Sequence, residues 1–324
     1  MSTKTTLVET ASMRSRRVAR ARSLFKEIRV PHPRQTELHV ALEELRLTAT
    51  QSVGQPQGGV QLLAPWGSGK TVGAQLVEAA ILREQGQDRN DRPMVIAKLS
   101  TAGTAKSIPS AILRALGEPR SDKGDEEVLW MRAREALKDA RTRLLTIDET
   151  DRATRRPTIS GAIASALRDL ADEGICALAF LGTSKSESLF RNCQDLDERL
   201  DAPVTMEPLD FLIDEDKEIF SDLVRDFDEA MVDKKILRRP SQLAKGDTPR
   251  LLAEASNGIL RQLARIIETA MISVVRRDGD AITRDDLADA VADWSIAKGL
   301  IDYNPFEMDR SANDGDLGSI EDVA

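Results

Sequence analysis

The feature that most constrains this chain is a glycine-rich loop that lies between an apolar run and a helical stretch. Residues 64–71 read Ala-Pro-Trp-Gly-Ser-Gly-Lys-Thr and directly follow the run Val60–Leu63. They match the phosphate-binding pattern G-x-x-x-x-G-K-[ST] at every fixed position except the first, where Ala64 replaces glycine. The stretch 72–83 has the period of a helix with one apolar face. Strand, loop and helix therefore come in the order that a nucleoside triphosphate site needs.

The chemistry of such a loop assigns a role to most of its residues. Its backbone N–H groups turn inward, and the following helix adds the positive end of its dipole. We expect Lys70 to reach the β- and γ-phosphates of ATP and the Thr71 hydroxyl to ligate Mg²⁺. The alternative is an ordinary glycine-containing turn, and Ala64 is compatible with the loop provided that its φ is negative. The predicted nucleotide-binding residues here are Ala64, Pro65, Trp66, Gly67, Ser68, Gly69, Lys70 and Thr71.

Apolar runs alternate with helical stretches through the first two thirds of the chain. This alternation predicts an α/β fold with a five-stranded parallel sheet sandwiched by helices, with ligands bound at the carboxyl ends of the strands. The expected strands after the first are 94–99, 143–148, 176–182 and 204–207, and the expected helices between them are 107–116, 126–141 and 160–171.

Polar residues at the ends of two predicted strands supply the remaining chemistry. The run Leu144–Ile147 ends in Asp148 and Glu149. We expect Asp148 to hold the Mg²⁺ shell together with Thr71, and Glu149 to orient and polarise the attacking water. The next strand delivers Thr183, which can reach the γ-phosphate or the water if that strand lies between the first and third. Ser184 follows it, and the alternative for this second hydroxyl is the N-cap of a helix.

The strand pattern stops at residue 214, and the ranges 214–232, 248–255, 259–276 and 283–297 have the pattern of helices. Thr283 and Asp286 resemble a capping box at the start of the last one. We expect a flexible basic arm over 1–29, with a helix over 14–26 as the alternative for part of it. An α/β domain over 30–209, a small helical domain over 210–300 and a disordered acidic tail over 301–324 are expected to follow.

Charge is distributed unevenly over a chain whose net charge is −8. Residues 1–34 hold nine Lys and Arg against two Glu, which gives +7, whereas residues 302–324 hold seven acids against one Arg, which gives −6. A basic arm on an acidic body is typical of a contact with nucleic acid or an acidic partner, the alternative being a solvated tail.

The composition excludes several other classes of protein. No apolar run approaches the roughly 20 residues that cross a bilayer, and the basic N-terminus has no apolar signal region, so we expect a cytoplasmic protein without a membrane contact. The two cysteines form no framework, and Cys176 is expected to be a reduced core residue. His32 and His39 offer no metal site.

Taken in order, the loop at 64–71, the strand at 144–149, the Leu-Gly-Thr at 181–183 and the segment 195–200 resemble AAA+ ATPases. More narrowly, the chain is similar to the transposition helper ATPases TniB and TnsC over residues 28–295. That similarity rests on Arg-Val-Pro-His-Pro-Arg at 29–34 and on Leu-Arg-Asp-Leu at 167–170 ahead of the Gly-Thr strand end. The chain departs from the helpers at Ala64, at Thr-Asp-Arg 150–152 and at Leu200.

The resemblance implies roles for two arginines and a helical lid after the α/β domain. Arg199 matches an arginine finger, which inserts into the neighbouring subunit's site and neutralises charge on the γ-phosphate. A surface ion pair is the alternative for Arg199, and Arg191 is the second candidate for the finger. Arg261 matches the second sensor, a contact to the nucleotide, with Arg265 one turn further on as the alternative.

The resemblance also implies a ring or helical filament of subunits around duplex DNA, bound through its backbone without sequence preference. The expected function is an ATP- and Mg²⁺-dependent ATPase that selects the target in DNA transposition, with a transposase and a target-selection protein as partners. Alternatives are an initiator or helicase loader, a regulatory nucleotide switch, and a nucleotide-stabilised scaffold with negligible turnover. The candidate DNA contacts are Lys98, Lys106, Arg152, Arg155 and Arg156.

Overall fold

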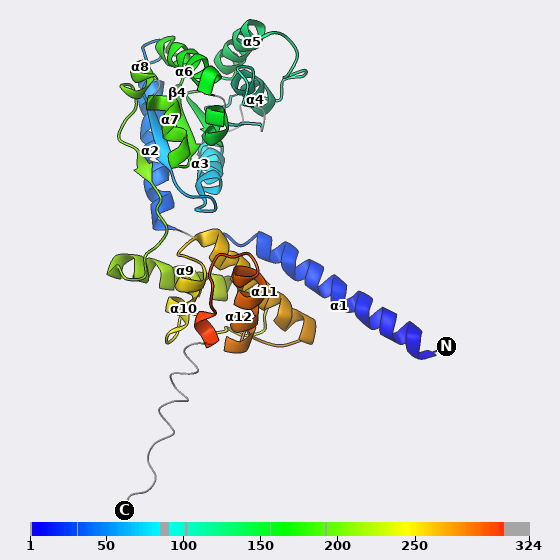
Figure 1. Cartoon of the computed structure of the whole chain (residues 1–324). Helices are drawn as coiled ribbons and strands as arrows, with labels where there is room; N and C mark the ends of the chain where they lie inside the picture. The colour runs from blue at the N-terminus through cyan, green and yellow to red at the C-terminus, as the bar shows by residue number, and fades with distance from the viewer. Residues whose placement is uncertain are drawn as a thin grey trace, which may run out of the picture. The chain divides into compact units, whose positions relative to one another are not determined.

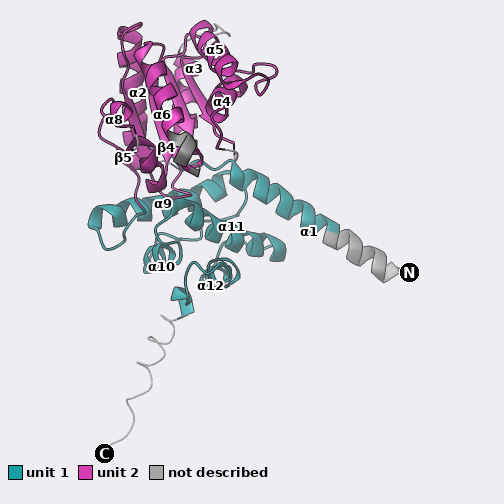
Figure 2. Cartoon of the chain, turned by 45° about the horizontal axis from the view of Figure 1, so that its top comes forward, with its two compact units in different colours: residues 1–32, 208–324 teal, residues 33–207 magenta. Residues whose placement is uncertain are grey.

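The computed structural model describes residues 2–30, 32–84, 91–100, 103–155, 157–191 and 193–307, without the side chains of 2–11 and 155–160. The chain divides into two compact units (Figure 2). One, the α/β unit, spans residues 33–207. The other, the helical unit, combines residues 1–32 with 208–324. The expected boundary near residue 209 lies close to the observed one, but the N-terminal segment belongs to the helical unit.

The α/β unit is built on a five-stranded sheet with the order β2-β3-β4-β1-β5. Every paired strand runs parallel to its neighbour, which confirms the predicted fold class. Strand β4 lies between β3 and β1, so the ends of these strands meet at one edge. The strands are β1 (Gly59–Leu63), β2 (Met94–Lys98), β3 (Leu144–Asp148), β4 (Ala177–Gly182) and β5 (Val204–Thr205).

Helices cover both faces of this sheet (Figure 1). Successive strand residues point to opposite faces, so Leu144 packs with α2 and α3 whereas Leu145 packs with α4, α5 and α6. The strands are buried on both sides, which is why they are continuous apolar runs in the sequence. The helices are α2 (Pro33–Gln51), α3 (Lys70–Glu84), α4 (Ser107–Ala115), α5 (Glu126–Asp139) and α6 (Pro157–Asp172).

Short elements follow β3 and β4 at the carboxyl edge of the sheet. Their lengths are below what hydrophobic periodicity can detect, so the sequence did not predict them. At Gly182 a Cβ atom would lie only 2.4 Å from Ser186 Oγ, so glycine permits the tight turn that leaves β4. The elements are η1 (Thr150–Arg155), η2 (Ser184–Ser186), α7 (Glu187–Arg191) and α8 (Gln194–Asp197).

The helical unit packs its helices around a core of its own. The capping box at Thr283 and Asp286 is present, as predicted. The last helix continues as a π-helical turn, η3 (Val291–Ile296). The helices are α1 (Ser2–Lys26), α9 (Asp214–Asp233), α10 (Thr248–Ala255), α11 (Leu260–Arg277) and α12 (Arg284–Ala290).

Both ends of the chain differ from the expected arm and tail. The helix α1 covers the arm from Ser2 to Lys26, a longer range than the expected 14–26. Ala21 and Phe25 on this helix, and Ile28 just after it, are buried in the core of the helical unit, where Phe25 stacks on Phe227 with ring centroids 6.0 Å apart. At the other end Phe306 is buried in the same core. The acidic segment 308–324 lies outside the described residues.

Two further sequence predictions concern membranes and cysteines. Among the described helices, none combines the length and the apolar character that crossing a bilayer requires. Cys176 is fully buried, and burial raises the pKa of its thiol to about 12. This cysteine is therefore an inert core residue, as predicted.

Candidate nucleotide-binding site

The glycine-rich loop joins the end of β1 to the start of α3. Gly67 and Gly69 have φ values of +92° and +96°, which glycine adopts without a steric penalty. Ala64 does not have a positive φ, so the condition for alanine at this position is met. Its N–H donates to the Gly182 carbonyl at 3.1 Å, which ties the start of the loop to the end of β4.

The first two residues of α3, Lys70 and Thr71, contact the loop and the end of β3. Lys70 Nζ lies back across the loop and donates to the carbonyl oxygens of Ala64 at 2.6 Å and Pro65 at 3.0 Å. The Thr71 hydroxyl donates to Asp148 Oδ2 at 3.0 Å. The loop after β1 and the acid at the end of β3, 77 positions apart, therefore meet directly.

The second acid of the pair, Glu149, is held in an unusual conformation. Its φ is +63°, a value that costs energy for a residue with a Cβ, and its N–H donates to Asp148 Oδ1 at 2.9 Å. Its carboxylate lies between Lys98 Nζ at 3.4 Å and Arg152 Nε at 3.3 Å. Two of the residues predicted to contact DNA are therefore engaged with the predicted catalytic carboxylate.

Thr183 follows β4 at the same edge. Its hydroxyl and its N–H both donate to Asp151 Oδ1, at 2.6 Å and 3.0 Å. The Thr183 hydroxyl also accepts from Lys185 N–H at 3.3 Å, so it caps η2 in addition to facing the site. Sequence reasoning missed Asp151, because nothing local indicates that the segment after β3 touches the end of β4.

The residues at this edge fit a nucleotide with Mg²⁺. Ser68 Oγ is buried in the loop with no hydrogen-bond partner within the described part of the chain, so it has capacity for a ligand. Thr71 and Asp148 offer the hard oxygen atoms that Mg²⁺ prefers. No group of three or more His, Cys, Asp or Glu in the described ranges could hold a metal by itself. A Mg²⁺ ion here would depend on phosphate and water oxygens for the rest of its shell.

Arg199 lies at the opposite end of β1 from the loop. Its carbonyl accepts from Gly59 N–H at 3.1 Å, and the five residues of β1 separate Gly59 from the loop by roughly 16 Å. Its guanidinium forms an ion pair with Asp172 at 2.6 Å. Arg199 is therefore remote from the loop of its own subunit. Arg191, the second candidate, is exposed and pairs with Glu187.

The remaining predicted site residues are spread over the molecule. Arg261 is exposed in the first turn of α11, whereas Arg265 pairs with the buried Glu268. Lys106 Nζ donates to the Gly124 carbonyl at 2.8 Å. The side chain of Arg155 and the whole of Arg156 lie outside the described residues.

Comparison with known proteins identifies the fold of the α/β unit that carries this site. Residues 53–190 match the family model described as AAA domain. Solved structures of ORC proteins share the architecture. The α/β unit has the AAA+ P-loop fold.

The similar structures cover most of the chain at low sequence identity. The Aeropyrum pernix ORC2 protein in its ADPNP–ADP complexes aligns with a TM-score of 0.63 at 15% identity, over 84% of this chain and 71% of that one. The Aeropyrum pernix ORC1 protein in complex with DNA gives 0.58 at 17%, over 83% and 68%. A chain of Drosophila ORC bound to DNA gives 0.55 at 15%, over 86% and 65%. No curated protein matches the chain by sequence.

Proposed function

We propose that this protein is a Mg²⁺-dependent ATPase whose ATP-bound form assembles on duplex DNA. The observation that carries the ATPase part is the direct bond from Thr71 to Asp148, with Lys70 and Glu149 adjacent to it. A hydroxyl, a carboxylate, a lysine and a second carboxylate at one edge of a parallel sheet form the set that phosphoryl transfer to water uses.

Each of these residues has a defined task in the proposed reaction. Lys70 exchanges its bonds to the loop carbonyls for bonds to phosphate oxygens. Glu149 orients a water and accepts its proton as the water attacks the γ-phosphate. Thr183 holds the γ-phosphate or the water, with its hydroxyl positioned by Asp151. When bound at Thr71 and Asp148, Mg²⁺ neutralises the phosphate charge.

The assembly part rests on the position of Arg199 and on the resemblance to transposition helpers. An arginine that lies at the far end of β1 suits the site of a neighbouring subunit better than its own. The similarity to TniB and TnsC supports the finer proposal, in which the assembly selects a target and recruits a transposase with the help of a target-selection protein. An initiator role is the second candidate, favoured by the structural likeness to the origin recognition proteins.

The test of the ATPase proposal compares the wild-type protein with Glu149→Gln and with the distant Lys123→Ala. We expect Glu149→Gln to lower the rate of ATP hydrolysis by about a hundredfold or more, because it removes the group that accepts the proton of water. It should still bind a fluorescent ATP analogue, and Lys123→Ala should behave as wild type. Equal and negligible rates in all three proteins, with ATP still bound, would show a nucleotide-stabilised scaffold instead.

A further inference from the structure

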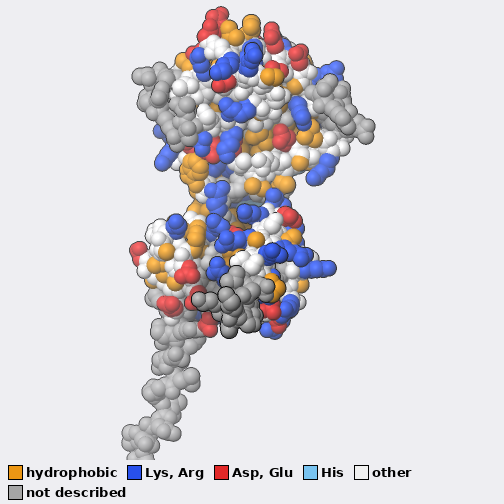
Figure 3. All heavy atoms as spheres, turned by 90° about the vertical axis from the view of Figure 1, so that its right-hand side faces the viewer, with side chains coloured by type: hydrophobic (Ala, Val, Ile, Leu, Met, Phe, Trp, Pro, Cys, Tyr) orange, Lys and Arg blue, Asp and Glu red, His pale blue; other side chains and the backbone are white. Residues whose placement is uncertain are grey.

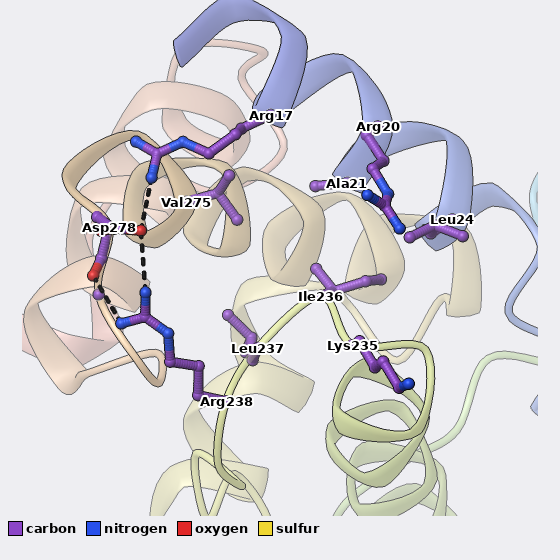
Figure 4. Close-up of a pocket in the computed structure, with 11 residues that line it drawn as sticks. Arg17, Arg20, Ala21, Leu24, Lys235, Ile236, Leu237, Arg238, Val275 and Asp278 are labelled. Atoms are coloured by element: carbon purple, nitrogen blue, oxygen red, sulfur yellow. Dashed lines mark hydrogen bonds and ion pairs between the residues drawn. The ribbon is translucent and has the colours of Figure 1, made fainter. Parts of the chain in front are cut away.

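A basic pocket lies within the helical unit, well separated in sequence from the nucleotide loop. It has a volume of about 270 Å³ and lies between α1, the turn after α9 and the carboxyl end of α11 (Figure 4). We call it the α1 pocket. Its charged lining residues are Arg17, Arg20, Lys235, Arg238 and Asp278.

Asp278 aligns two of the arginines beside one another. Its Oδ1 atom accepts from Arg17 at 2.6 Å and from Arg238 at 3.2 Å, as the dashed lines in Figure 4 show. Each guanidinium has five N–H donors in a fixed plane, so these bonds leave donors for another acceptor. The Asp278 carboxylate therefore orients the two arginines. Asp280 also pairs with Arg238 at 2.7 Å, so two carboxylates offset two of the four positive charges at the pocket.

The other two cations of the pocket have no such partner. Among the described residues, neither the Arg20 nor the Lys235 side chain has a hydrogen bond or an ion pair, and both are exposed. A helix carboxyl end does attract a cation, but α11 already ends in Arg276 and Arg277. The dipole of α11 therefore does not account for four further cations beside the two carboxylates Asp278 and Asp280.

The positive charge continues along α1 beyond the pocket. Arg14 and Arg16 are exposed within one turn of Arg17 and Arg20. Lys and Arg side chains gather on this face of the helical unit (Figure 3). An extended row of exposed cations matches the repeated phosphates of a nucleic-acid backbone, rather than one small anion. Among the described residues, no aromatic side chain lines the pocket, so these residues offer no platform for stacking a base.

We propose that the α1 pocket binds the backbone phosphates of duplex DNA, without sequence preference and without bound nucleotide. This proposal rests on the proposed DNA-binding function and gives the helical unit a DNA contact of its own. Arg17 and Arg238, held by Asp278, form the fixed part of the contact. Arg20 and Lys235 complete it.

The experiment measures binding of the full chain to a short labelled duplex by fluorescence anisotropy, without nucleotide and with a slowly hydrolysed ATP analogue. The test variant is Arg20→Ala/Lys235→Ala, which disturbs no ion pair of the described structure. The control is Arg225→Ala/Arg250→Ala, which removes the same charge from α9 and α10 of the same unit outside the pocket.

We expect the nucleotide-free wild type to bind DNA, and the test variant to bind about tenfold more weakly or worse at 0.1 M salt. Over about 0.05–0.2 M salt, the slope of log K against log salt should fall by about two units in the test variant and stay at the wild-type value in the control. This pair of results supports the α1 pocket, because each lost phosphate contact removes about one unit of slope.

Three outcomes would overturn the proposal, and they are distinguishable. Binding that requires the ATP analogue and is equal in both variants contradicts the α1 pocket but leaves the proposed function intact. The absence of DNA binding in every condition contradicts both. If a peptide with the acidic sequence 308–324 binds wild type more tightly than DNA does and fails to bind Arg20→Ala/Lys235→Ala, the occupant of the pocket is the chain's own tail.

Discussion

The α/β unit and the helical unit use charged side chains in opposite ways. At the carboxyl edge of the sheet the two cations Lys98 and Arg152 both face Glu149, and further carboxylates lie beside them. At the α1 pocket four cations share two carboxylates, Asp278 and Asp280. The first arrangement fixes the position of individual reacting groups. The second leaves a net positive charge, which suits the attraction of a polyanion.

This contrast predicts that substitutions in the two units change different measured quantities. Groups that are held by specific short contacts act through distance and angle, so a single substitution there should change a rate constant. An excess of exposed charge acts through the number of phosphates it contacts, so a substitution there should change affinity and salt dependence. Substitutions in the two units should therefore differ in which quantity they change.

Lys70→Ala should have the largest effect, and it should be confined to the nucleotide site. We expect the rate of ATP hydrolysis to fall by about a thousandfold, because the loop loses the ammonium that contacts the phosphates. DNA binding without nucleotide should be unchanged, because Lys70 belongs to the other unit. Parallel ATPase and anisotropy measurements on the same preparation check both statements, and a loss of nucleotide-free DNA binding would break the comparison.

Phe25→Ala should act on the helical unit alone. Phe25 is 7% exposed and stacks on Phe227, so its removal should lower the free energy of unfolding of this unit by about 3 kcal/mol. Faster hydrogen exchange in α1 and weaker DNA binding should follow, because α1 carries Arg17 and Arg20. Binding of ATP should not change. The exposed neighbour Ser23→Ala is the control, and equal exchange in both variants would contradict the docking of α1.

Asp151→Ala should lower kcat for ATP hydrolysis by roughly tenfold while KM changes by less than about twofold, because the residue positions Thr183. Asp151→Asn keeps an acceptor oxygen for both bonds from Thr183, so it should restore most of the rate. Steady-state kinetics of the pair separate positioning from a general loss of folding. Equal rates in the two variants would mean that the acceptor at this position is irrelevant.

Asp286→Asn should have the smallest effect, about 1 kcal/mol on the helical unit. Burial alone would raise the pKa of Asp286, but hydrogen bonds from Arg277 and Thr283 outweigh it, so this pKa lies below its ordinary value. The stabilising contribution is therefore complete above pH 4 and is lost as the pH falls through the lowered pKa. Urea unfolding between pH 2 and pH 7 should show a smaller acid loss in Asp286→Asn than in wild type.

The sheet and the nucleotide loop were predictable from the sequence because their signals are local. Continuous apolar runs gave the strands, and the fixed spacing of 64–71 gave the loop. The two acids Asp148 and Glu149 were predictable for the same reason, because they directly follow an apolar run. The meeting of Thr71 with Asp148 follows once the strands are parallel, because neighbouring carboxyl ends share an edge.

The contacts that could not be predicted join residues with no common pattern. The bond between Asp151 and Thr183 depends on a short 3₁₀ turn and on the order of β3 and β4. The pairing of Arg199 with Asp172 depends on where α6 ends. For α1 a signal did exist, since Ala21, Phe25 and Ile28 recur at helical spacing. The many arginines between them obscured it and favoured the interpretation as a flexible arm.

The central claim is that ATP assembles this protein on DNA through an arginine supplied by a neighbour. Electron microscopy of the full chain with plasmid DNA, with and without a slowly hydrolysed ATP analogue, tests it most directly. We expect rings or filaments on DNA only when the analogue is present, for wild type and for Glu149→Gln. Arg199→Ala should lose ATP hydrolysis in the same preparations. Single subunits that ignore DNA in the presence of the bound analogue would contradict the claim.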